Sequence, residues 1–421
     1  MIIERPFYLQ KLIVGMGSDQ VKIVTGVRRC GKSFLVFNLF KSYLLSQGVP
    51  QANIVEMSFD GFADRKYRDP EVFFSYVLER LGGDGVADGM RYVLLDEVQL
   101  LVDFPEVLID LIGMDNVDVY VTGSNARLLS KDVVTEFRGR GQEIRLAPLS
   151  FSEFMSVYDG DKREGYAEYA TYGGLPAVLS WNAPEEKAAY LTGLYRELYL
   201  RDIVERNDVR DFSNLEELVD VLSSSIGSLT NSTRLSATFK SEKRVSLAPE
   251  TIDRYLSFLE DAFLVDRVRR YDLKGRRYIG TPYKFYFSDL GLRNARMNFR
   301  QMEETHIMEN VVYNELVGRG FCVDVGVVPF AAKGGDGKVH RAQLEIDFVC
   351  NKGSKRYYVQ SAFALPDEQK QAQEQRPLLK VGDGFKKIIV TKDGLGPYYN
   401  DDGILLMNVY DFLLNKGSLD F

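Results

Sequence analysis

The sequence predicts an α/β fold: the parallel sheet of a P-loop NTPase, followed by a helical lid and further domains. Two observations lead to this prediction. Residues 26–33 spell a complete G-x-x-x-x-G-K-S loop between an apolar run and an amphipathic one. Apolar runs also alternate with helical patterns up to about residue 155, which is typical of a parallel sheet with helices on both faces. These strand-like runs are Val21–Val24, Ile54–Phe59, Tyr92–Leu95, Val117–Val121 and Glu143–Leu146.

The loop at residues 26–33 has the composition of a triphosphate-binding site. Its glycines let backbone N–H groups curl around phosphate oxygens, Lys32 reaches the β and γ phosphates, and the Ser33 hydroxyl is a ligand for Mg²⁺. We therefore expect ATP and Mg²⁺ as cofactors. GTP is disfavoured because the sequence has no Asn-Lys-x-Asp signature for guanine. The residues predicted to bind nucleotide are Gly26, Arg28, Arg29, Cys30, Gly31, Lys32, Ser33 and Phe34.

The apolar run at residues 92–95 ends in two carboxylates, Asp96 and Glu97. The strand opposite a P-loop supplies such a pair in enzymes that hydrolyse nucleotide. Asp96 is predicted to bind at the nucleotide and to hold Mg²⁺ through water, beside Ser33, and Glu97 to polarise the attacking water as general base. A small-molecule kinase has less need of a water-activating glutamate. The alternative is a buried strand that ends in a solvated acidic turn.

Small polar residues follow the next strand-like run. Thr122, Gly123, Ser124 and Asn125 come directly after it. Ser124 or Asn125 is a candidate to hydrogen-bond the γ-phosphate or the attacking water. Gly, Ser and Asn are also the ordinary residues of a turn at the end of a strand, so both interpretations stay open.

A helical lid is expected at residues 156–210, after a P-loop core at residues 1–155. Just before the lid, Ser150 and Glu153 fit a capping box at a helix start. The helix breakers at 173–176, Gly-Gly-Leu-Pro, imply a tight turn between two helices. This region resembles a lid packed over the nucleotide.

Residues 211–300 are predicted to form a winged helix-turn-helix domain. Three helical segments, at 214–226, 235–241 and 249–259, precede two strand-like runs. Residues 228–300 carry 15 Lys or Arg against 8 Asp or Glu, in a chain whose net charge is −7, so we expect an anionic partner such as duplex DNA there. The alternative is a protein-docking domain with a solvated basic hairpin. The expected wing contains Arg267, Arg269, Arg270, Lys274, Arg276 and Arg277.

Residues 301–421 are expected to form a restriction-endonuclease-like α/β domain. The predicted helix at residues 309–316 carries the carboxylates Glu309 and Glu315, Asp347 lies on a later strand and Gln360 on the next. Restriction-endonuclease-like nucleases have a helix carboxylate and strand residues in this order, and their carboxylates hold Mg²⁺. The last of these strands normally ends in Asp/Glu-x-Lys, whereas this chain reads Gln-Ser-Ala from Gln360. Gln is a poorer metal ligand than a carboxylate, and alanine cannot activate water. We expect the fold without the nuclease activity.

Composition limits the other possibilities. With 421 residues, 45% hydrophobic and 27% charged, the chain has the composition of a soluble protein with two or three cores. Its three cysteines are widely spaced and its two histidines lie far apart, which argues against disulfides, a zinc site and His-based chemistry. No stretch reaches the roughly 18 apolar residues of a membrane helix. We expect a cytoplasmic protein with no membrane partner.

Taken together, the motifs resemble one large prokaryotic group of AAA+ superfamily ATPases. The group joins its ATPase to a C-terminal domain of unknown function, of the DUF4143 type, that is restriction-endonuclease-like. The resemblance covers nearly the whole chain. The usual Gly-Gly-Phe/Tyr-Pro turn has leucine here. The segments that carry the resemblance are residues 5–9, 26–33, 95–99, 122–125, 149–154, 173–176, 284–292 and 345–348.

The resemblance implies an AAA+ core with Asn125 or Ser124 as its sensor. It also implies that Arg138 or Arg140 is an arginine finger offered to a neighbouring subunit, and therefore a homo-oligomer, either a ring or a dimer. The alternative is that both arginines pair with acidic residues of their own subunit. The residues predicted to be catalytic are Glu97, Asn125, Arg138 and Arg140.

These expectations combine into one functional hypothesis. ATP binding and hydrolysis would change how the C-terminal modules present a surface to DNA or to an unidentified protein partner. Two alternatives stay open: a Mg²⁺-dependent nuclease regulated by ATP, and a nucleotide-dependent protein-interaction switch with no DNA role.

Overall fold

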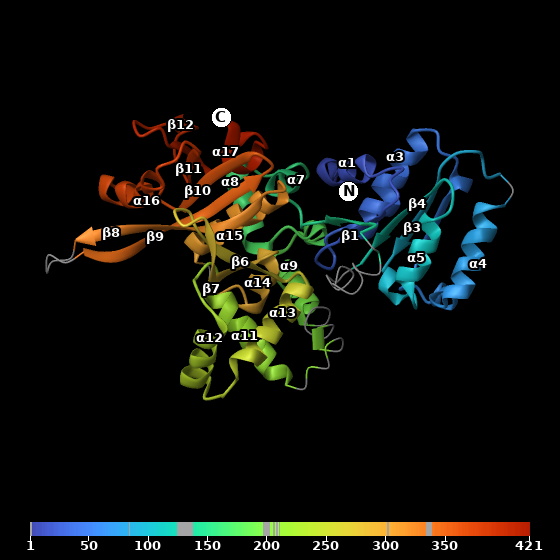
Figure 1. Ribbon diagram of the computed structural model, residues 1–421, viewed down its shortest axis with the longest axis horizontal. Helices are drawn as coiled ribbons and strands as arrows, with labels where there is room; N and C mark the ends of the chain where they lie inside the picture. The colour runs from blue at the N-terminus through green and yellow to red at the C-terminus, as the bar shows by residue number, and fades with distance from the viewer. Residues whose placement is uncertain are drawn as a thin grey trace. The chain divides into compact units, whose positions relative to one another are not determined.

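The computed structural model describes residues 2–83, 85–123, 137, 139–196, 203, 204, 207, 209, 211–300, 303–333 and 339–421. The chain divides into two compact units (Figure 1). The first comprises Met1–Pro148 and Asp261–Phe263, and the second comprises Leu149–Glu260 and Leu264–Phe421.

The first unit contains a five-stranded sheet in the order β2-β3-β4-β1-β5. Every neighbouring pair in this sheet is parallel. The predicted parallel α/β fold is therefore confirmed, and β4 lies between the P-loop strand β1 and the acidic strand β3. The strands are β1 (Val21–Thr25), β2 (Ile54–Ser58), β3 (Arg91–Asp96), β4 (Val117–Thr122) and β5 (Gly141–Arg145).

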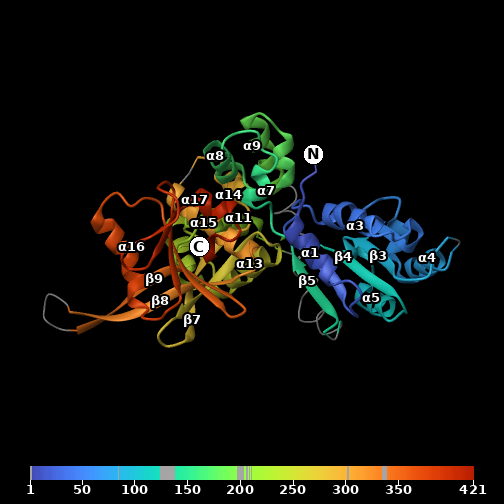
Figure 2. The same cartoon turned by 90° about the horizontal axis from the view of Figure 1, so that it is seen from above.

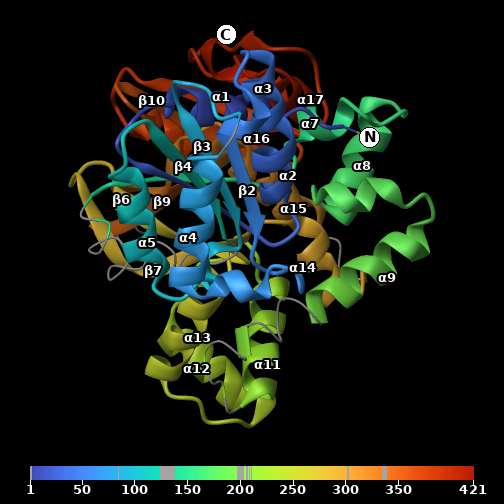
Figure 3. The same ribbon diagram turned by 90° about the vertical axis from the view of Figure 1, so that its right-hand side faces the viewer.

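Helices cover both faces of this sheet (Figure 3). Val93 and Val121 belong to one buried cluster with side chains of α4 and α5. On the opposite face, the ring of Phe40 lies 4.3 Å from the ring of Tyr120. Strands buried on both sides are typical of parallel sheets. The helical segments of this unit are α1 (Pro6–Val14), α2 (Lys32–Phe34), the π-helical turn η1 (Leu35–Phe40), α3 (Lys41–Ser46), α4 (Pro70–Leu81) and α5 (Phe104–Ile112).

The second unit is built on an eight-stranded sheet in the order β12-β13-β11-β10-β9-β8-β6-β7. Its pairs are of mixed direction: β10 is antiparallel to β9 and parallel to β11. Strands β8 and β9 form a long paired ribbon (Figure 2). The strands are β6 (Val265–Asp272), β7 (Arg277–Phe287), β8 (Cys322–Lys333), β9 (Val339–Lys352), β10 (Lys355–Ala362), β11 (Lys386–Thr391), β12 (Tyr398–Tyr399) and β13 (Leu405–Asn408).

Helices of the second unit surround this sheet and also form a separate group of α11, α12 and α13 (Figure 1, Figure 3). The capping box at the start of α7 is confirmed, because Ser150 and Glu153 exchange side-chain and backbone hydrogen bonds. The helices are α7 (Phe151–Met155), α8 (Lys162–Tyr172), α9 (Pro184–Leu194), α11 (Phe212–Ser224), α12 (Ser232–Thr238), α13 (Pro249–Asp261), α14 (Leu290–Arg296), α15 (Glu304–Gly318), α16 (Glu368–Lys380) and α17 (Val409–Leu414).

The hairpin that was expected to be a free wing is part of the large sheet. Strands β6 and β7 pair with each other, and residues 270–272 of β6 also pair in parallel with residues 325–327 of β8. The sequence could not reveal this second pairing, because the two segments lie more than fifty residues apart. The three predicted helices are present, whereas the hairpin that follows them extends the sheet.

The Gly-Gly-Leu-Pro turn after α8 encloses a buried carboxylate. The backbone N–H of Gly174 donates to Asp289 at 2.8 Å, and a Cβ added at Gly173 would lie 2.3 Å from the same carboxylate. Asn294, one helix turn later, donates to the carbonyls of Ala170 and Thr171 at the end of α8. The helices that were expected to form a lid are therefore tied to α14 inside the second unit.

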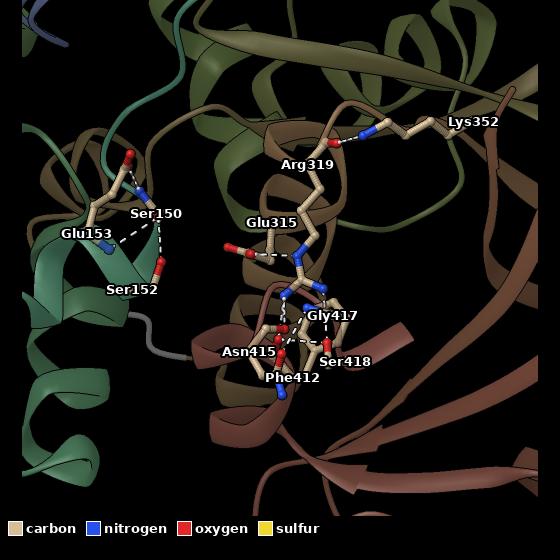
Figure 4. A network of polar contacts seen from close by, with 10 residues as sticks. All are labelled: Ser150, Ser152, Glu153, Glu315, Arg319, Lys352, Phe412, Asn415, Gly417 and Ser418. Carbon is tan, nitrogen blue, oxygen red and sulfur yellow. Dashed lines mark hydrogen bonds and ion pairs between the residues drawn. The ribbon is translucent and has the colours of Figure 1, made fainter. Parts of the chain in front are cut away.

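An arginine at the end of α15 joins that helix to the C-terminal segment (Figure 4). Arg319 donates to Glu315 at 2.7 Å, to the hydroxyl of Ser418 at 2.9 Å and to the carbonyl of Phe412. Burial raises the pKa of Glu315, and the adjacent guanidinium opposes that shift. This network anchors the last residues of the chain. Across the described residues, none of the helices combines the length and the apolar character needed to cross a membrane.

Candidate active site

The P-loop connects β1 to α2, and its backbone takes conformations that require its glycines. Gly26 has φ +137° and Gly31 has φ +102°, while Arg29 between them has φ +64°. A Cβ at Gly26 would come within 2.1 Å of the carbonyl oxygen of Leu146. Only glycine fits at position 26, because both the φ angle and the close backbone approach exclude a side chain.

Lys32 begins the helix after the loop and is turned back over it. Its ammonium donates to the carbonyl oxygens of Gly26 and Val27, at 3.0 and 3.1 Å, and the side chain is buried. These carbonyls satisfy a cation that is shielded from water. The ammonium is therefore held at the P-loop, where a bound phosphate would exchange with these carbonyl partners.

Ser33 and Asp96 join the P-loop to the acidic strand. The Ser33 hydroxyl lies 2.8 and 2.9 Å from the two carboxylate oxygens of Asp96. The hydroxyl of Thr122, at the end of β4, donates to the same carboxylate, and Ser58 of β2 donates to it at 3.3 Å. Four segments that are far apart in sequence thus converge at the carboxyl ends of parallel strands, where α/β sheets bind their ligands.

Burial raises the pKa of Asp96 above its usual value. The negative charges of Glu97 and Asp60 raise it further, whereas the hydrogen bonds from Thr122 and Ser33 oppose the shift. A divalent cation placed here would favour the ionised form.

Glu97 follows Asp96 in a left-handed backbone conformation, with φ 52° and ψ 46°. Its backbone N–H donates to the Thr122 hydroxyl at 3.3 Å, and the side-chain amide of Gln99 donates to its carboxylate. A non-glycine residue with positive φ is uncommon and is often found at functional sites. The Glu97 side chain is half-buried.

Sequence reasoning missed three residues that support this site. Thr122 and Gln99 position the acidic pair as described above. Arg5 is almost fully buried, and its guanidinium donates to the carbonyl oxygens of Cys30 in the P-loop and Ala147 beyond β5. The only sequence signals were their places in the segments that carry the family resemblance, at residues 5–9, 95–99 and 122–125.

The other predicted residues have varied positions. Arg28 is half-buried, Arg29 is exposed, and Phe34 is 36% exposed. The thiol of Cys30 is fully buried and points to the Leu146 carbonyl, so only its backbone faces the loop; burial raises the pKa of this thiol. Of the proposed sensors and arginine fingers, the one that the structure describes is Arg140, which is exposed. Ser124, Asn125 and Arg138 lie outside the described residues.

The donor set fits Mg²⁺ bound together with a nucleotide. Mg²⁺ is usually held by one or two carboxylates with water and substrate phosphates. Ser33 and Asp96 supply a hydroxyl and one carboxylate within hydrogen-bond distance of each other. Within the described ranges, no group of three or more His, Cys, Asp or Glu side chains is arranged to hold a metal alone. The remaining ligands at this position would be phosphate oxygens and water.

Two family models match parts of this chain. The model described as "AAA domain" matches residues 18–155. A second model, "Domain of unknown function (DUF8612)", matches residues 163–303. This domain lies in the middle of the chain, and it differs in type from the C-terminal DUF4143-type domain named in the sequence analysis. The first match contains the whole P-loop and the acidic pair.

Relatives extend over almost the whole chain. An "Uncharacterized protein" of Haemophilus influenzae is 35% identical over 98% of this chain and 99% of its own length. "Uncharacterized protein MJ1544" of Methanocaldococcus jannaschii is 23% identical over 93% of this chain and 85% of its own. Among solved structures, the Walker-type ATPase of Pyrococcus abyssi is 16% identical, covers 70% of this chain and 96% of its own, and has a TM-score of 0.49.

Proposed function

Because the chain belongs to the same family as its Haemophilus influenzae relative and carries the AAA domain of ATP-binding proteins, we propose that it hydrolyses ATP and couples hydrolysis to the engagement of a partner. Binding of ATP follows from the family, and hydrolysis is the step that the proposal adds. One observation supports hydrolysis most directly. Asp96 and Glu97 follow each other at the end of β3, and the first touches Ser33 of the P-loop while the second takes a left-handed backbone conformation directly after it.

Each residue has a distinct part in the proposed reaction. Lys32 exchanges its two carbonyl partners for β- and γ-phosphate oxygens, and the loop amides orient the phosphate chain. Ser33 and Asp96 would hold Mg²⁺, which would supply positive charge to the phosphates. Glu97 accepts a proton from the attacking water and is oriented for this by the amide of Gln99. Asn125 or Ser124 and an arginine at position 138 or 140 of a neighbouring subunit complete the site in this proposal.

Calorimetry tests the nucleotide site. Wild type is titrated with ATP in the presence of Mg²⁺, beside Lys32→Ala and a control, Lys66→Ala, which removes an exposed lysine from the same unit. We expect Lys32→Ala to weaken binding by about a hundredfold or more, because a charge-assisted contact to phosphate is lost, and Lys66→Ala to bind like wild type. Equal affinity of all three proteins would place the nucleotide elsewhere.

Duplex DNA is the partner that we propose for the basic region. Several of its arginines are already engaged: Arg267 pairs with Glu260 at 2.7 Å, and the guanidinium of Arg269 stacks 4.2 Å from the centre of the Tyr278 ring. The basic side chains at the β6–β7 turn are exposed, and any contact with phosphates would come chiefly from them. These exposed residues are Lys274, Arg276 and Arg277.

Fluorescence anisotropy with a labelled duplex tests this partner. Replacing the three exposed residues of the β6–β7 turn by Glu should remove salt-dependent DNA binding, since each cation that contacts a phosphate contributes to the salt dependence. A matched control replaces three exposed basic residues of the first unit by Glu. Binding that both triple variants retain, or that wild type lacks, would favour a nucleotide-dependent switch for a protein partner. The control residues are Arg65, Lys66 and Arg80.

A further inference from the structure

A second acidic cluster lies in the eight-stranded sheet, far in sequence from the P-loop. Glu309 of α15 and Asp347 of β9 meet there beside Gln360 of β10, as the nuclease-like order of these residues predicted. The backbone N–H of Asp347 donates to the Gln360 side chain at 3.3 Å, and the backbone N–H of Ser361 donates to Asp347 at 2.9 Å. Glu345, two residues before Asp347, adds a third carboxylate at the rim.

A lysine that sequence reasoning left unassigned lies at the centre of this cluster. Lys284 comes from β7, which is an edge strand of the sheet, and it is 4% exposed. Its ammonium lies 2.8 Å from Glu309, 2.8 Å from Glu345 and 3.6 Å from Asp347. Three carboxylates thus face a single cation. Carboxylates brought together in a buried site need such a charge, because their mutual repulsion and desolvation are otherwise unfavourable.

Hydrogen bonds of Tyr286 and Gln360 orient the side chains around Lys284. The hydroxyl of Tyr286, which is fully buried, donates to the same oxygen of Glu309 at 2.5 Å. The side-chain amide of Gln360 donates in the other direction, to Glu374 of α16 at 3.1 Å. The oxygen of this amide accepts from the backbone N–H of Asp347, so both ends of the Gln360 amide are engaged by the protein.

The residues present do not fit a divalent cation at this position. Mg²⁺ requires near-octahedral oxygen ligands at about 2.1 Å. An ammonium within hydrogen-bond distance of two of the carboxylates occupies the space in which such an ion would be bound. In the part of the chain that the structure describes, no set of three acidic, histidine or cysteine side chains has the arrangement of a metal site, and these three carboxylates are included in that finding.

We propose that the ammonium of Lys284 takes the place of a divalent cation in this cluster, so that the second unit contains a closed ion cluster with no metal-dependent hydrolase activity. The cluster joins β7, α15 and β9 as a metal would, through one fixed charge supplied by the chain. Removal of that charge, with the three carboxylates kept, converts the cluster into a divalent-cation site. This inference concerns the second unit and does not depend on ATP hydrolysis by the first.

Mn²⁺ binding, followed by the loss of the free-ion signal in electron paramagnetic resonance, tests the proposal. Three proteins are compared: wild type, Lys284→Ala, and the double variant Lys284→Ala with Asp347→Asn. We expect Lys284→Ala to gain one Mn²⁺ site that is about tenfold tighter or more than any in wild type, because two buried carboxylates and the half-buried Glu345 are left without the ammonium. The double variant should lose this added site. The P-loop contributes the same background in all three proteins.

Two results of the Mn²⁺-binding experiment would overturn the proposal. One is a folded Lys284→Ala protein that binds Mn²⁺ no better than wild type. The other is Mn²⁺ binding by wild type that Asp347→Asn removes, and this second measurement still decides the matter when Lys284→Ala does not fold. Wild type should also leave supercoiled plasmid intact with Mn²⁺ or Mg²⁺. Nicking that Asp347→Asn abolishes would show an active metal centre and contradict the account.

Discussion

The hydroxyl of Ser33 lies within 2.9 Å of both carboxylate oxygens of Asp96, although the two residues are 63 positions apart. One belongs to the P-loop and the other ends a strand that is separated from the P-loop strand by β4. Each oxygen atom of this pair is a hard ligand of the kind that Mg²⁺ prefers. The contact therefore brings together the two residues that we propose as the protein's ligands for Mg²⁺ bound with nucleotide in the first unit.

Removing the Ser33 hydroxyl should weaken nucleotide binding only when Mg²⁺ is present. In Ser33→Ala we expect the affinity for Mg²⁺–ATP to fall about tenfold or more, because one metal ligand and a hydrogen bond to Asp96 are lost. Affinity for ATP in EDTA should change little. Ser33→Thr, which keeps the hydroxyl, is the matched control. Calorimetry with and without Mg²⁺ gives the comparison, and an equal loss in both conditions would contradict the role assigned to Ser33.

Gly26 should tolerate no side chain. In Gly26→Ala the added Cβ would meet the Leu146 carbonyl at 2.1 Å, at a φ of +137° that other residues rarely adopt. We expect the first unit to lose about 3 kcal/mol of stability or more, together with nucleotide binding. The control is Gly48→Ala, where φ is also positive and no atom lies within 4 Å, with an expected loss of about 1 kcal/mol. Similar denaturant midpoints for both variants would disprove the steric argument.

Gln99 should affect turnover more than binding. Its amide donates to Glu97, so Gln99→Ala removes one hydrogen bond that orients the carboxylate that we propose as general base. We expect kcat to fall about tenfold with ATP affinity unchanged, since orientation of a base contributes at the transition state. Steady-state kinetics together with calorimetry separates the two effects. A weaker affinity with unchanged kcat would assign Gln99 to nucleotide binding.

The stability of the second unit should depend on the protonation of Asp289. Burial raises the pKa of this carboxyl to about 6 in the folded chain, above its usual value of 3.8. The folded state therefore binds the proton more tightly, and its stability falls as pH rises from about 4 to about 6. The loss attributable to Asp289 is at most about 3 kcal/mol.

Thermal unfolding of wild type and Asp289→Asn across that pH range isolates this effect. The Tm of wild type should fall relative to that of Asp289→Asn as pH rises to about 6, and the difference should then stay constant. A difference that does not vary with pH would mean that Asp289 keeps an ordinary pKa in the folded protein. The backbone hydrogen bonds from Gly174 and Leu292, which favour the ionised form, would be the physical reason for that outcome.

Local motifs made the first unit predictable. The P-loop, the carboxylates after β3 and all five strands of the sheet can be found from runs of neighbouring residues, because each is defined by short-range periodicity or spacing. The capping box at Ser150 is local for the same reason. The residues that support the site were not predicted, because Arg5 and Thr122 form hydrogen bonds with residues that lie far from them in sequence.

Long-range pairing limited prediction in the second unit. The turn at Gly173 and Gly174 was predicted. Its contact with Asp289 was not, because Asp289 comes 115 residues after Gly174. The basic hairpin was interpreted as a wing, because its pairing with β8 cannot be read from the hairpin itself. Likewise, Lys284 of β7 lies 3.6 Å from Asp347 of β9, and no spacing rule connects the two strands.

Steady-state ATP hydrolysis tests the central claim most directly. Wild type, Lys32→Ala and Glu97→Gln are compared with Mg²⁺, each with and without duplex DNA at low salt. The account predicts turnover by wild type that both substitutions abolish, with ATP binding retained in Glu97→Gln, since that variant loses only the proposed base. Stimulation by DNA would identify the coupled partner. Binding of ATP by wild type without any turnover, or turnover that survives Glu97→Gln, would contradict the claim that this site hydrolyses ATP.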